Sequence, residues 1–290
     1  MGRRLISILA STAVVLLLPI QARGGQPLSG TLKKIKDTGT MVIGYRENSR
    51  PFSFLGPDGK PTGYSIDLCQ RIAAAAQQEV GLSSLEIKYV PVTVETRIQA
   101  VANGTVDLEC GSTTITISRQ EQVDFTNPTF LDGGGLLVLA GSGIKGIEDL
   151  GGKRVAVIPG TTTERALKDV IQRSYQLVSI VPVKDHNEGL AVLETGLADA
   201  YASDRTILIG LMIGSKDPKR LALAESMFSF EPYGYMLRRG DAAFRLVANR
   251  TLARLFRTEQ IALIFQKWFG SLGRPTGALL AVYLIHGIPE

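Results

Sequence analysis

Glycine, hydroxyl side chains and one arginine gather in ECGSTTITISRQ, residues 109–120, directly behind the apolar run TVDLEC. A loop that leads into a helix points free N–H groups outward, so Ser112, Thr114 and this backbone can hold an anion. Arg119, which follows within the same stretch, can grip a carboxylate through two parallel hydrogen bonds. The stretch also contains Cys110 and two serines, and the nucleophile of an enzyme is therefore the competing interpretation.

Five further side chains complete this chemistry. Thr161 lies in the Gly-Thr loop after the apolar run RVAVIP, where it can build a second anion cradle. Asp204 ends the run LADAYASD and supplies the negative charge that an ammonium group requires. Arg46 follows the first apolar run, and Arg97 and His186 begin two short helices. Each of them alone is more often a helix cap or a surface residue, and only their convergence at the ends of strands predicts a site for a small molecule.

Strand-like and helix-like patterns alternate along residues 41–110, which favours parallel βαβ units. The apolar residues of YSIDLCQRIAAAAQQEV (64–80) recur at helical spacing, whereas LEIKYVPV (85–92) alternates like a strand. The same order of elements returns in residues 153–204. In both halves a helix ends at a glycine, an aspartate follows three residues later, and a strand comes next. These matched halves predict two α/β lobes of similar plan.

We therefore expect an α/β protein of two lobes, each a mostly parallel sheet flanked by helices. Residues 31–134 and 239–270 are expected to form the first lobe, and residues 135–238 the second, with hinge strands at its ends. Two extended segments, GGGLLVLAG (133–141) and YGYMLRRG (233–240), are expected to cross between the lobes.

The two ends of the chain have patterns of their own. Residues 1–22 predict a secretory signal peptide, because two arginines precede an apolar stretch and Ala22 offers a small residue for cleavage. The alternative is a membrane anchor, since the stretch is near the lower length limit for a span. Residues 271–290 are a C-terminal tail that is too short to span a bilayer, and either packing on a lobe or disorder is open for it.

Cys69 and Cys110 are the two cysteines of the chain. In an oxidising compartment they can form one disulfide, and the alternative of two buried free thiols is equally open. Two cysteines and two histidines at scattered positions match no zinc spacing, so we expect no metal. The formal charge of +5 is not concentrated in a basic block, so we expect no nucleic-acid partner.

Five stretches together resemble the periplasmic amino-acid-binding proteins of ABC importers, solute-binding protein family 3: IGYRENSRPFSF, GYSIDLC, ECGSTTITISRQ, PGTTTE and KDHNEGL. The resemblance extends from about residue 31 to residue 270 and is strongest to the glutamate/aspartate-binding branch. It implies the type II periplasmic binding protein fold, whose two lobes close on the ligand about a hinge. It also implies a periplasmic monomer without a cofactor, which hands an acidic L-amino acid to an ABC permease in the inner membrane.

The resemblance assigns roles around the α-carbon of the ligand. Arg119 would clamp the α-carboxylate, with help from backbone and hydroxyl groups of Ser112 and Thr114 and from Thr161 of the second lobe. Asp204 would take the α-ammonium group. These assignments imply one anion grip and one cation partner for every amino-acid ligand.

The resemblance also assigns the selective end of the site. Arg46, Arg97 and His186 would surround the side-chain carboxylate, which marks an acidic ligand. Two positions depart from the family pattern: Val94 stands where a serine contact is expected, and Ile158 where a threonine is expected. Both departures remove polar contacts near the ligand, so they bear on affinity and on the choice among acidic ligands.

An enzyme is the alternative function, because the same fold hosts periplasmic dehydratases of the cyclohexadienyl type. A catalytic Cys110 would need a base within hydrogen-bond reach, and His186 is the one realistic candidate. The resemblance makes that histidine a ligand contact, and no G-x-S-x-G elbow occurs. We therefore expect a binding protein with no catalytic residue.

Overall fold

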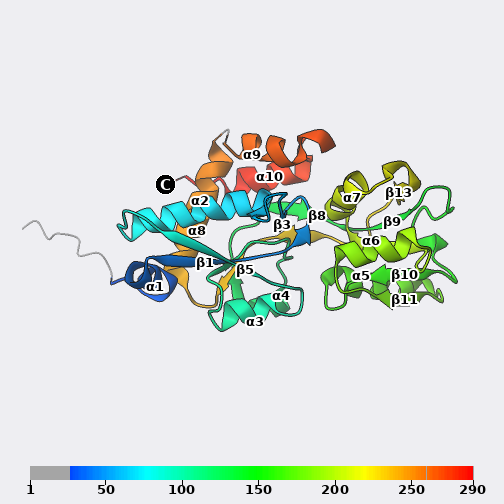
Figure 1. The fold of residues 1–290 in the computed structure, drawn as a ribbon, viewed down its shortest axis with the longest axis horizontal. Helices are drawn as coiled ribbons and strands as arrows, with labels where there is room; N and C mark the ends of the chain where they lie inside the picture. The colour runs from blue at the N-terminus through cyan, green and yellow to red at the C-terminus, as the bar shows by residue number, and fades with distance from the viewer. Residues whose placement is uncertain (1–26, 259, 290) are drawn as a thin grey trace, which may run out of the picture.

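Two lobes lie side by side, joined by a pair of extended strands (Figure 1). The protein is described by a computed structural model, which covers residues 27–258 and 260–289. The expected signal peptide, residues 1–22, lies outside the described residues. Each lobe is built on a five-stranded sheet, so the expected two-lobed α/β fold is confirmed.

The sheet of the first lobe has the strand order β5-β1-β6-β15-β7. Its strands are β5 (Glu86–Pro91), β1 (Thr40–Tyr45), β6 (Leu108–Glu109), β15 (Met236–Arg238) and β7 (Val123–Phe125). β1 pairs in parallel with β5 and β6, whereas β15 pairs antiparallel with β6 and β7. Four strands therefore run in one direction, and only β15 runs against them.

Helices cover both faces of this sheet because the side chains of its strands alternate (Figure 1). Met41 and Ile43 of β1 share a core with Ile72 of helix α2, whereas Val42 packs against the cluster that holds Val101 of helix α3. The helices of this lobe are α1 (Gly30–Thr38), α2 (Tyr64–Glu79), α3 (Arg97–Ala102), α4 (Ile117–Gln120), α8 (Ala242–Arg257) and α9 (Gln260–Phe269). A small sheet of β2 (Asn48–Ser49), β3 (Ser53–Leu55) and β4 (Pro61–Thr62) stands beside them.

The sheet of the second lobe repeats the plan with the order β11-β10-β12-β9-β13. Its strands are β11 (Ser179–Pro182), β10 (Arg154–Val157), β12 (Ala200–Asp204), β9 (Gly134–Leu139) and β13 (Leu221–Leu223). β10 pairs in parallel with β11 and β12, and β9 pairs antiparallel with β12 and β13. Again four strands share one direction and one runs against them, so both sheets are mostly parallel, as expected.

Side chains of the second sheet also alternate between its two faces and pack into two different clusters. Tyr201 of β12 belongs to the same core as Leu193 of helix α6 and Leu208 of helix α7, whereas Ala202 clusters with Leu167 of helix α5. The helices of this lobe are α5 (Thr162–Ser174), α6 (His186–Glu194) and α7 (Arg205–Gly214). Short 3₁₀ helices are η1 (Ile147–Asp149) and η2 (Pro218–Arg220) here, and η3 (Gly270–Leu272) after α9.

The two crossing strands are β8 (Phe130–Asp132) and β14 (Glu231–Tyr233), which pair antiparallel with Glu231 opposite Asp132. We expected the crossings at 133–141 and 233–240, and the structure places both a few residues earlier along the chain. The apolar run after the first crossing is β9 of the second sheet, and the run after the second crossing is β15 of the first sheet. The hinge strands are only three residues long and carry two acids, the buried Glu231 and the partly buried Asp132, so they have no apolar pattern as strong as the runs that follow them.

A disulfide joins Cys69 in α2 to Cys110 at the end of β6, with the two Cα atoms 6.3 Å apart. Of the two alternatives left open by the sequence, the structure therefore shows the disulfide and not two free thiols. Both cysteines are fully buried, so the bond fastens one covering helix of the first lobe to its sheet.

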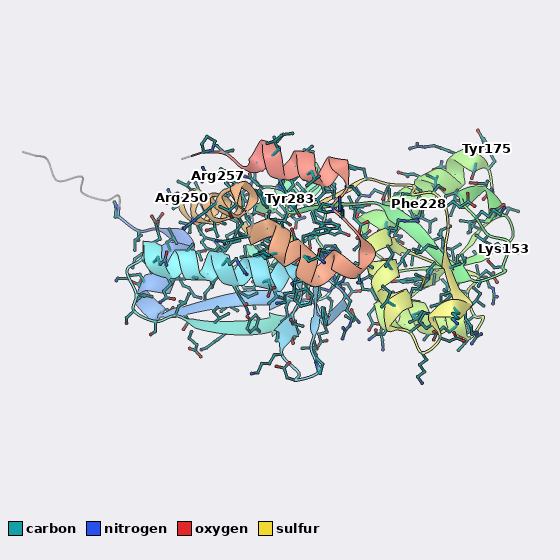
Figure 2. The ribbon with its side chains drawn as sticks, turned by 90° about the horizontal axis from the view of Figure 1, so that it is seen from above. Lys153, Tyr175, Phe228, Arg250, Arg257 and Tyr283 are labelled. Carbon is teal, nitrogen blue, oxygen red and sulfur yellow. A yellow bond between two sulfur atoms is a disulfide. The ribbon has the colours of Figure 1, made fainter. Side chains whose placement is uncertain are left out.

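The C-terminal tail forms helix α10 (Gly277–His286), which lies on the first lobe (Figure 2). The Tyr283 ring stacks on Phe256 of α8 with centroids 4.9 Å apart, and its hydroxyl oxygen lies 2.9 Å from that of Tyr64. Of the two outcomes left open for this tail, the structure shows packing. Among the described residues, no helix is long and apolar enough to cross a membrane.

Candidate functional site

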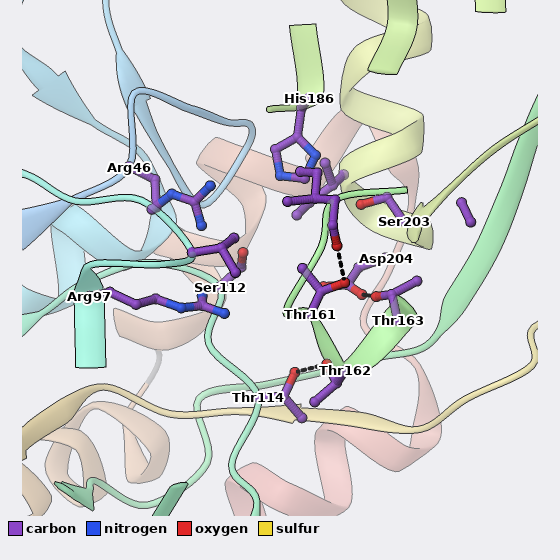
Figure 3. Close-up of a pocket in the computed structure, with 14 residues that line it drawn as sticks. Arg46, Arg97, Ser112, Thr114, Thr161, Thr162, Thr163, His186, Ser203 and Asp204 are labelled. Carbon is purple, nitrogen blue, oxygen red and sulfur yellow. Dashed lines mark hydrogen bonds between the residues drawn. The ribbon is translucent and has the colours of Figure 1, made fainter. Parts of the chain in front are cut away.

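A polar cavity lies between the two lobes (Figure 3). Its lining residues come from both of them: Arg46, Val94, Arg97, Ser112 and Thr114 from the first, and Ile158, Thr161, Thr162, Thr163, His186, Ala202, Ser203, Asp204 and Ile207 from the second. A cavity lined mainly by polar side chains from two lobes suits a small polar ligand.

The cavity lies where the carboxyl ends of the parallel strands meet, as expected for open α/β sheets. Arg46 directly follows β1, and Ser112 follows β6 in the first lobe. Asp204 is the last residue of β12 in the second lobe. Thr161 caps helix α5, because its hydroxyl accepts from the backbone N–H of Glu164 at 3.0 Å. The local sequence thus sets each of these side chains at an element end.

Two buried guanidinium groups face the cavity from the first lobe (Figure 3). Arg97 donates from Nη1 to Thr113 Oγ1 at 2.7 Å, and its buried Nε has no hydrogen-bond partner within the described chain. Burial, together with Arg97, lowers the pKa of Arg46 to about 10, and burial also lowers the pKa of Arg97. Even at about 10 the Arg46 guanidinium stays charged at neutral pH, so the site presents positive charge with donors to spare.

A buried carboxylate stands behind these arginines. Thr113 Oγ1 donates to Glu109 Oε2 at 2.9 Å, which links the acid to Arg97 through one hydroxyl group. Burial raises the pKa of Glu109, while Arg97 and the Thr113 hydroxyl act in the opposite direction. Glu109 is therefore connected to Arg97 of the first lobe through the Thr113 hydroxyl and is not one of the residues that line the cavity.

His186 begins helix α6 and enters the cavity as a neutral ring. Burial, with Arg46 and Arg97, lowers its pKa to about 3, so it carries no charge at physiological pH. Its Nδ1 lies 2.7 Å from the hydroxyl oxygen of Tyr201, which fixes the orientation of the ring. Gly189 makes room for this pair, because a Cβ there would lie 2.3 Å from the Tyr201 ring.

Asp204 faces the cavity from the second lobe. Its Oδ1 accepts from Thr163 Oγ1 at 2.7 Å, and its Oδ2 accepts from the Tyr233 hydroxyl. Burial, followed by the charge of Glu231, raises the pKa of Asp204 to about 6. At neutral pH the carboxylate is ionised in a buried place, which a positively charged ligand group would stabilise.

Arg119 does not line the cavity. It lies in α4, where its Nη1 donates to the backbone carbonyl of Thr114 at 2.7 Å. Its side chain is buried, and burial, with Arg97, lowers its pKa to about 10. The structure therefore brings together seven of the eight side chains predicted for the site and sets Arg119 directly behind one of them. Its role as the carboxylate clamp stays a prediction.

Three acids close to the site are not predicted by the sequence analysis. Glu109 interrupts the apolar run TVDLEC, and a charge inside an apolar strand was the signal that could have revealed it. Asp132 and Glu231 lie opposite each other on the hinge strands, and Tyr233 joins Asp132 to Asp204. No local pattern marks these residues, because strands about a hundred positions apart bring them together.

Residues 41–271 match the bacterial extracellular solute-binding proteins, family 3. The chain belongs to this family. This solute-binding protein is 42% identical over 275 residues to an L-glutamate/L-aspartate-binding protein of Pseudomonas aeruginosa, an alignment that covers 94% of this chain and 91% of the other. A glutamate/aspartate import solute-binding protein of Escherichia coli (strain K12) is 36% identical over 250 residues, with 86% and 83% of the two chains covered.

Solved structures agree with the two-lobed fold of the solute-binding protein. An ancestral amino acid-binding protein, a precursor of cyclohexadienyl dehydratase, matches it with a TM-score of 0.72 and 29% sequence identity. The match covers 83% of this chain and 100% of that one. The family and the two related proteins are named for binding, and the dehydratase is named in connection with this more distant structural neighbour.

Proposed function

We propose that this protein captures an acidic L-amino acid, glutamate or aspartate, between its lobes and delivers it to an ABC permease. The observation that carries the proposal is the pair Arg46 and Arg97, buried on one wall of the cavity, with Asp204 buried on the opposite wall. Cations on one side and an anion on the other match a ligand with two carboxylates and one ammonium group.

The spare donors of the first lobe make the second carboxylate of the ligand important. The positive charge of Arg97 lowers the pKa of Arg46, because two like charges that are buried close together are unfavourable. A neutral ligand would leave them without an anion in a desolvated place, which is costly. The side-chain carboxylate of glutamate or aspartate relieves that cost, and neutral His186 can add a hydrogen bond without further charge. The relatives named for glutamate and aspartate support the same assignment.

The contacts of the site favour binding over catalysis. Cys110 is held in the disulfide and offers no thiol, and its side chain is fully buried. His186 is held by Tyr201 and has a pKa far below neutrality, which fits a ligand contact better than a general base. We infer that the protein acts as a periplasmic monomer, with residues 1–22 as its signal peptide, and that the disulfide fits that oxidising compartment.

Calorimetric titration with glutamate, aspartate, glutamine and asparagine tests the function directly. We expect the acids to bind more tightly than the amides by roughly 2–5 kcal/mol, the cost of leaving one charge of a buried pair unmatched. Small-angle scattering should show compaction on addition of the acid, because the ligand groups come from both lobes. Equal affinities for glutamate and glutamine would overturn the acidic-ligand assignment, and consumption of the ligand over hours would favour an enzyme.

A further inference from the structure

One carboxylate oxygen of Glu231, in the hinge strand β14, accepts hydrogen bonds from both lobes. Glu231 Oε2 accepts a hydrogen bond from Thr114 Oγ1 at 2.6 Å and another from Thr162 Oγ1 at 2.7 Å. The two hydroxyl oxygens lie 3.2 Å apart, and Figure 3 draws this contact at the edge of the cavity. Glu231 is 1% exposed and is not among the residues that line the cavity.

The two threonines belong to different lobes. Thr114 follows β6 of the first sheet, and its backbone forms a β-bridge with Tyr233 of the hinge. Thr162 is the first residue of α5, which packs against β12 and β9 of the second sheet. Glu231 therefore gathers one hydroxyl group from each side of the cavity on a single atom.

Opening of the cleft must break this arrangement. Whichever lobe the Glu231 carboxylate follows, separation of the lobes carries Thr114 away from Thr162, and at least one of them must leave Oε2. Hydrogen bonds to an ionised carboxylate are short and about twice as strong as neutral ones. The lost bond therefore opposes opening, whereas the backbone pairing of β8 with β14 lies within the hinge and does not bridge the cavity.

We propose that Glu231 is a positioning residue that holds the lobes closed and thereby sets the lifetime of the bound ligand. The proposal rests on the proposed function, because closure around a ligand is the event that it controls. Glu231 also orients two side chains of the site. Because both threonine hydroxyl groups donate to Glu231 Oε2, their oxygen lone pairs remain available to a ligand in the cavity. The carboxylate thus acts on the ligand through two other side chains.

Three variants separate this role from simple support of the fold. Glu231→Gln keeps the size of the side chain and removes the charge, and Thr162→Val removes the hydroxyl group of the second lobe. Ser229→Ala is the matched control, because Ser229 Oγ donates to the other oxygen, Glu231 Oε1, at 2.6 Å from only two residues away and does not bridge the lobes. The readouts are stopped-flow glutamate dissociation, the association rate and the thermal midpoint of the ligand-free protein.

We expect Glu231→Gln and Thr162→Val each to speed dissociation about tenfold, or ~1.4 kcal/mol, with association within about twofold of wild type. The double variant should dissociate about as fast as either single variant, because both remove the same contact. Ser229→Ala should stay within about twofold of wild type. Unchanged dissociation in both single variants, or an effect of Ser229→Ala as large as theirs, overturns the proposal.

A ligand-free measurement keeps this test apart from the test of function. Dyes on Lys88→Cys of the first lobe and Lys219→Cys of the second report the distance between lobes in single molecules. We expect Glu231→Gln to reduce the closed population of the ligand-free protein about tenfold. If the wild type binds no amino acid, the proposed function fails, and this population still decides the role of Glu231. Equal closed populations in that case would overturn it.

Discussion

The two lobes share one plan of strands and carry opposite chemistry. The orders β5-β1-β6-β15-β7 and β11-β10-β12-β9-β13 correspond strand by strand, and in each sheet the reversed strand lies next to the hinge in the chain. The first lobe brings arginines to the cavity, whereas the second brings threonine hydroxyls, a neutral His186 and the carboxylate of Asp204. The strand topology therefore brings the loops of both lobes together. The charges of the residues in those loops determine whether a lobe binds the carboxylate groups or the ammonium group of a ligand.

The lobes also differ in how firmly they are built. Helices α8, α9 and α10 return to the first lobe after the chain has left the second, and the disulfide joins α2 to the sheet there. The second lobe has its own sheet and three α-helices but no disulfide among the described residues. We therefore expect the first lobe to be the more stable of the two.

Loss of Arg119 should have the largest effect on binding. Arg119→Met removes the charge behind Thr114, and we expect every amino-acid ligand to lose roughly 2–5 kcal/mol, because all of them share the α-carboxylate. Calorimetry on the acids and amides measures this. Arg173→Met, an exposed arginine of the second lobe, is the control and should bind normally. Binding that survives within a few-fold in Arg119→Met would remove this residue from the first lobe's share of the site.

The disulfide should be the next largest difference between the lobes. The bonded cysteines are 41 positions apart, and closing a loop of that size stabilises a fold by roughly 2–4 kcal/mol through the unfolded state. Replacing both cysteines by alanine should lower the free energy of unfolding by that amount, as measured by urea denaturation. Unchanged stability in the double variant would contradict the idea of a firmer first lobe.

The loops of the site can be predicted from the sequence, whereas the hinge cannot. Arg46, Ser112, Thr161 and Asp204 all line the cavity, and each lies at or within a few residues after the end of a recognisable apolar strand, where strand ends meet at one edge of a sheet. This logic needs only local pattern and the rule for parallel sheets.

The hinge and its acids could not be found in the same way. Asp132 and Glu231 face each other because strands of three residues pair across the molecule, and so short a strand has no periodicity to detect. The motif assigns Arg119 to the cavity, and the structure puts Thr114, a lining residue, between Arg119 and the cavity. Whether a side chain reaches the cavity depends on how both lobes pack around it, and a local sequence pattern does not predict that packing.

Arg97 should account for much of the preference for acids. Arg97→Met keeps an apolar stem in the buried position but removes a guanidinium group with an unpartnered Nε. We expect the gap between glutamate and glutamine to narrow by roughly 1.5–3 kcal/mol, the value of a hydrogen bond to a charged group. Glutamine itself is the internal control, since its affinity should change less. A parallel loss for both ligands would show that Arg97 supports the first lobe rather than selects the ligand.

The smallest expected effect is the pH dependence that the second lobe adds. Burial raises the pKa of Asp204 to about 6, so below that pH the ligand-free protein holds a proton where the ammonium group must bind. Binding then has to expel the proton, and affinity should fall about tenfold for each pH unit below the pKa. The side-chain carboxylate of a glutamate ligand, with a pKa of about 4.3, stays largely ionised at pH 5.

The pH dependence has to be divided between Asp204 and a second acid, Asp132. His186, with a pKa of about 3, and Arg46, with a pKa of about 10, do not titrate between pH 5 and pH 8. Asp132, whose pKa burial and Asp204 raise to about 7, shares the hydroxyl of Tyr233 with Asp204 and must be tested separately. Calorimetry should show glutamate binding about tenfold weaker at pH 5 than at pH 7.5, or ~1.4 kcal/mol. Asp132→Asn should keep a fall in affinity near pH 6, whereas Asp204→Asn should bind weakly at every pH, and a flat wild-type profile would contradict the assignment of the ammonium group to Asp204.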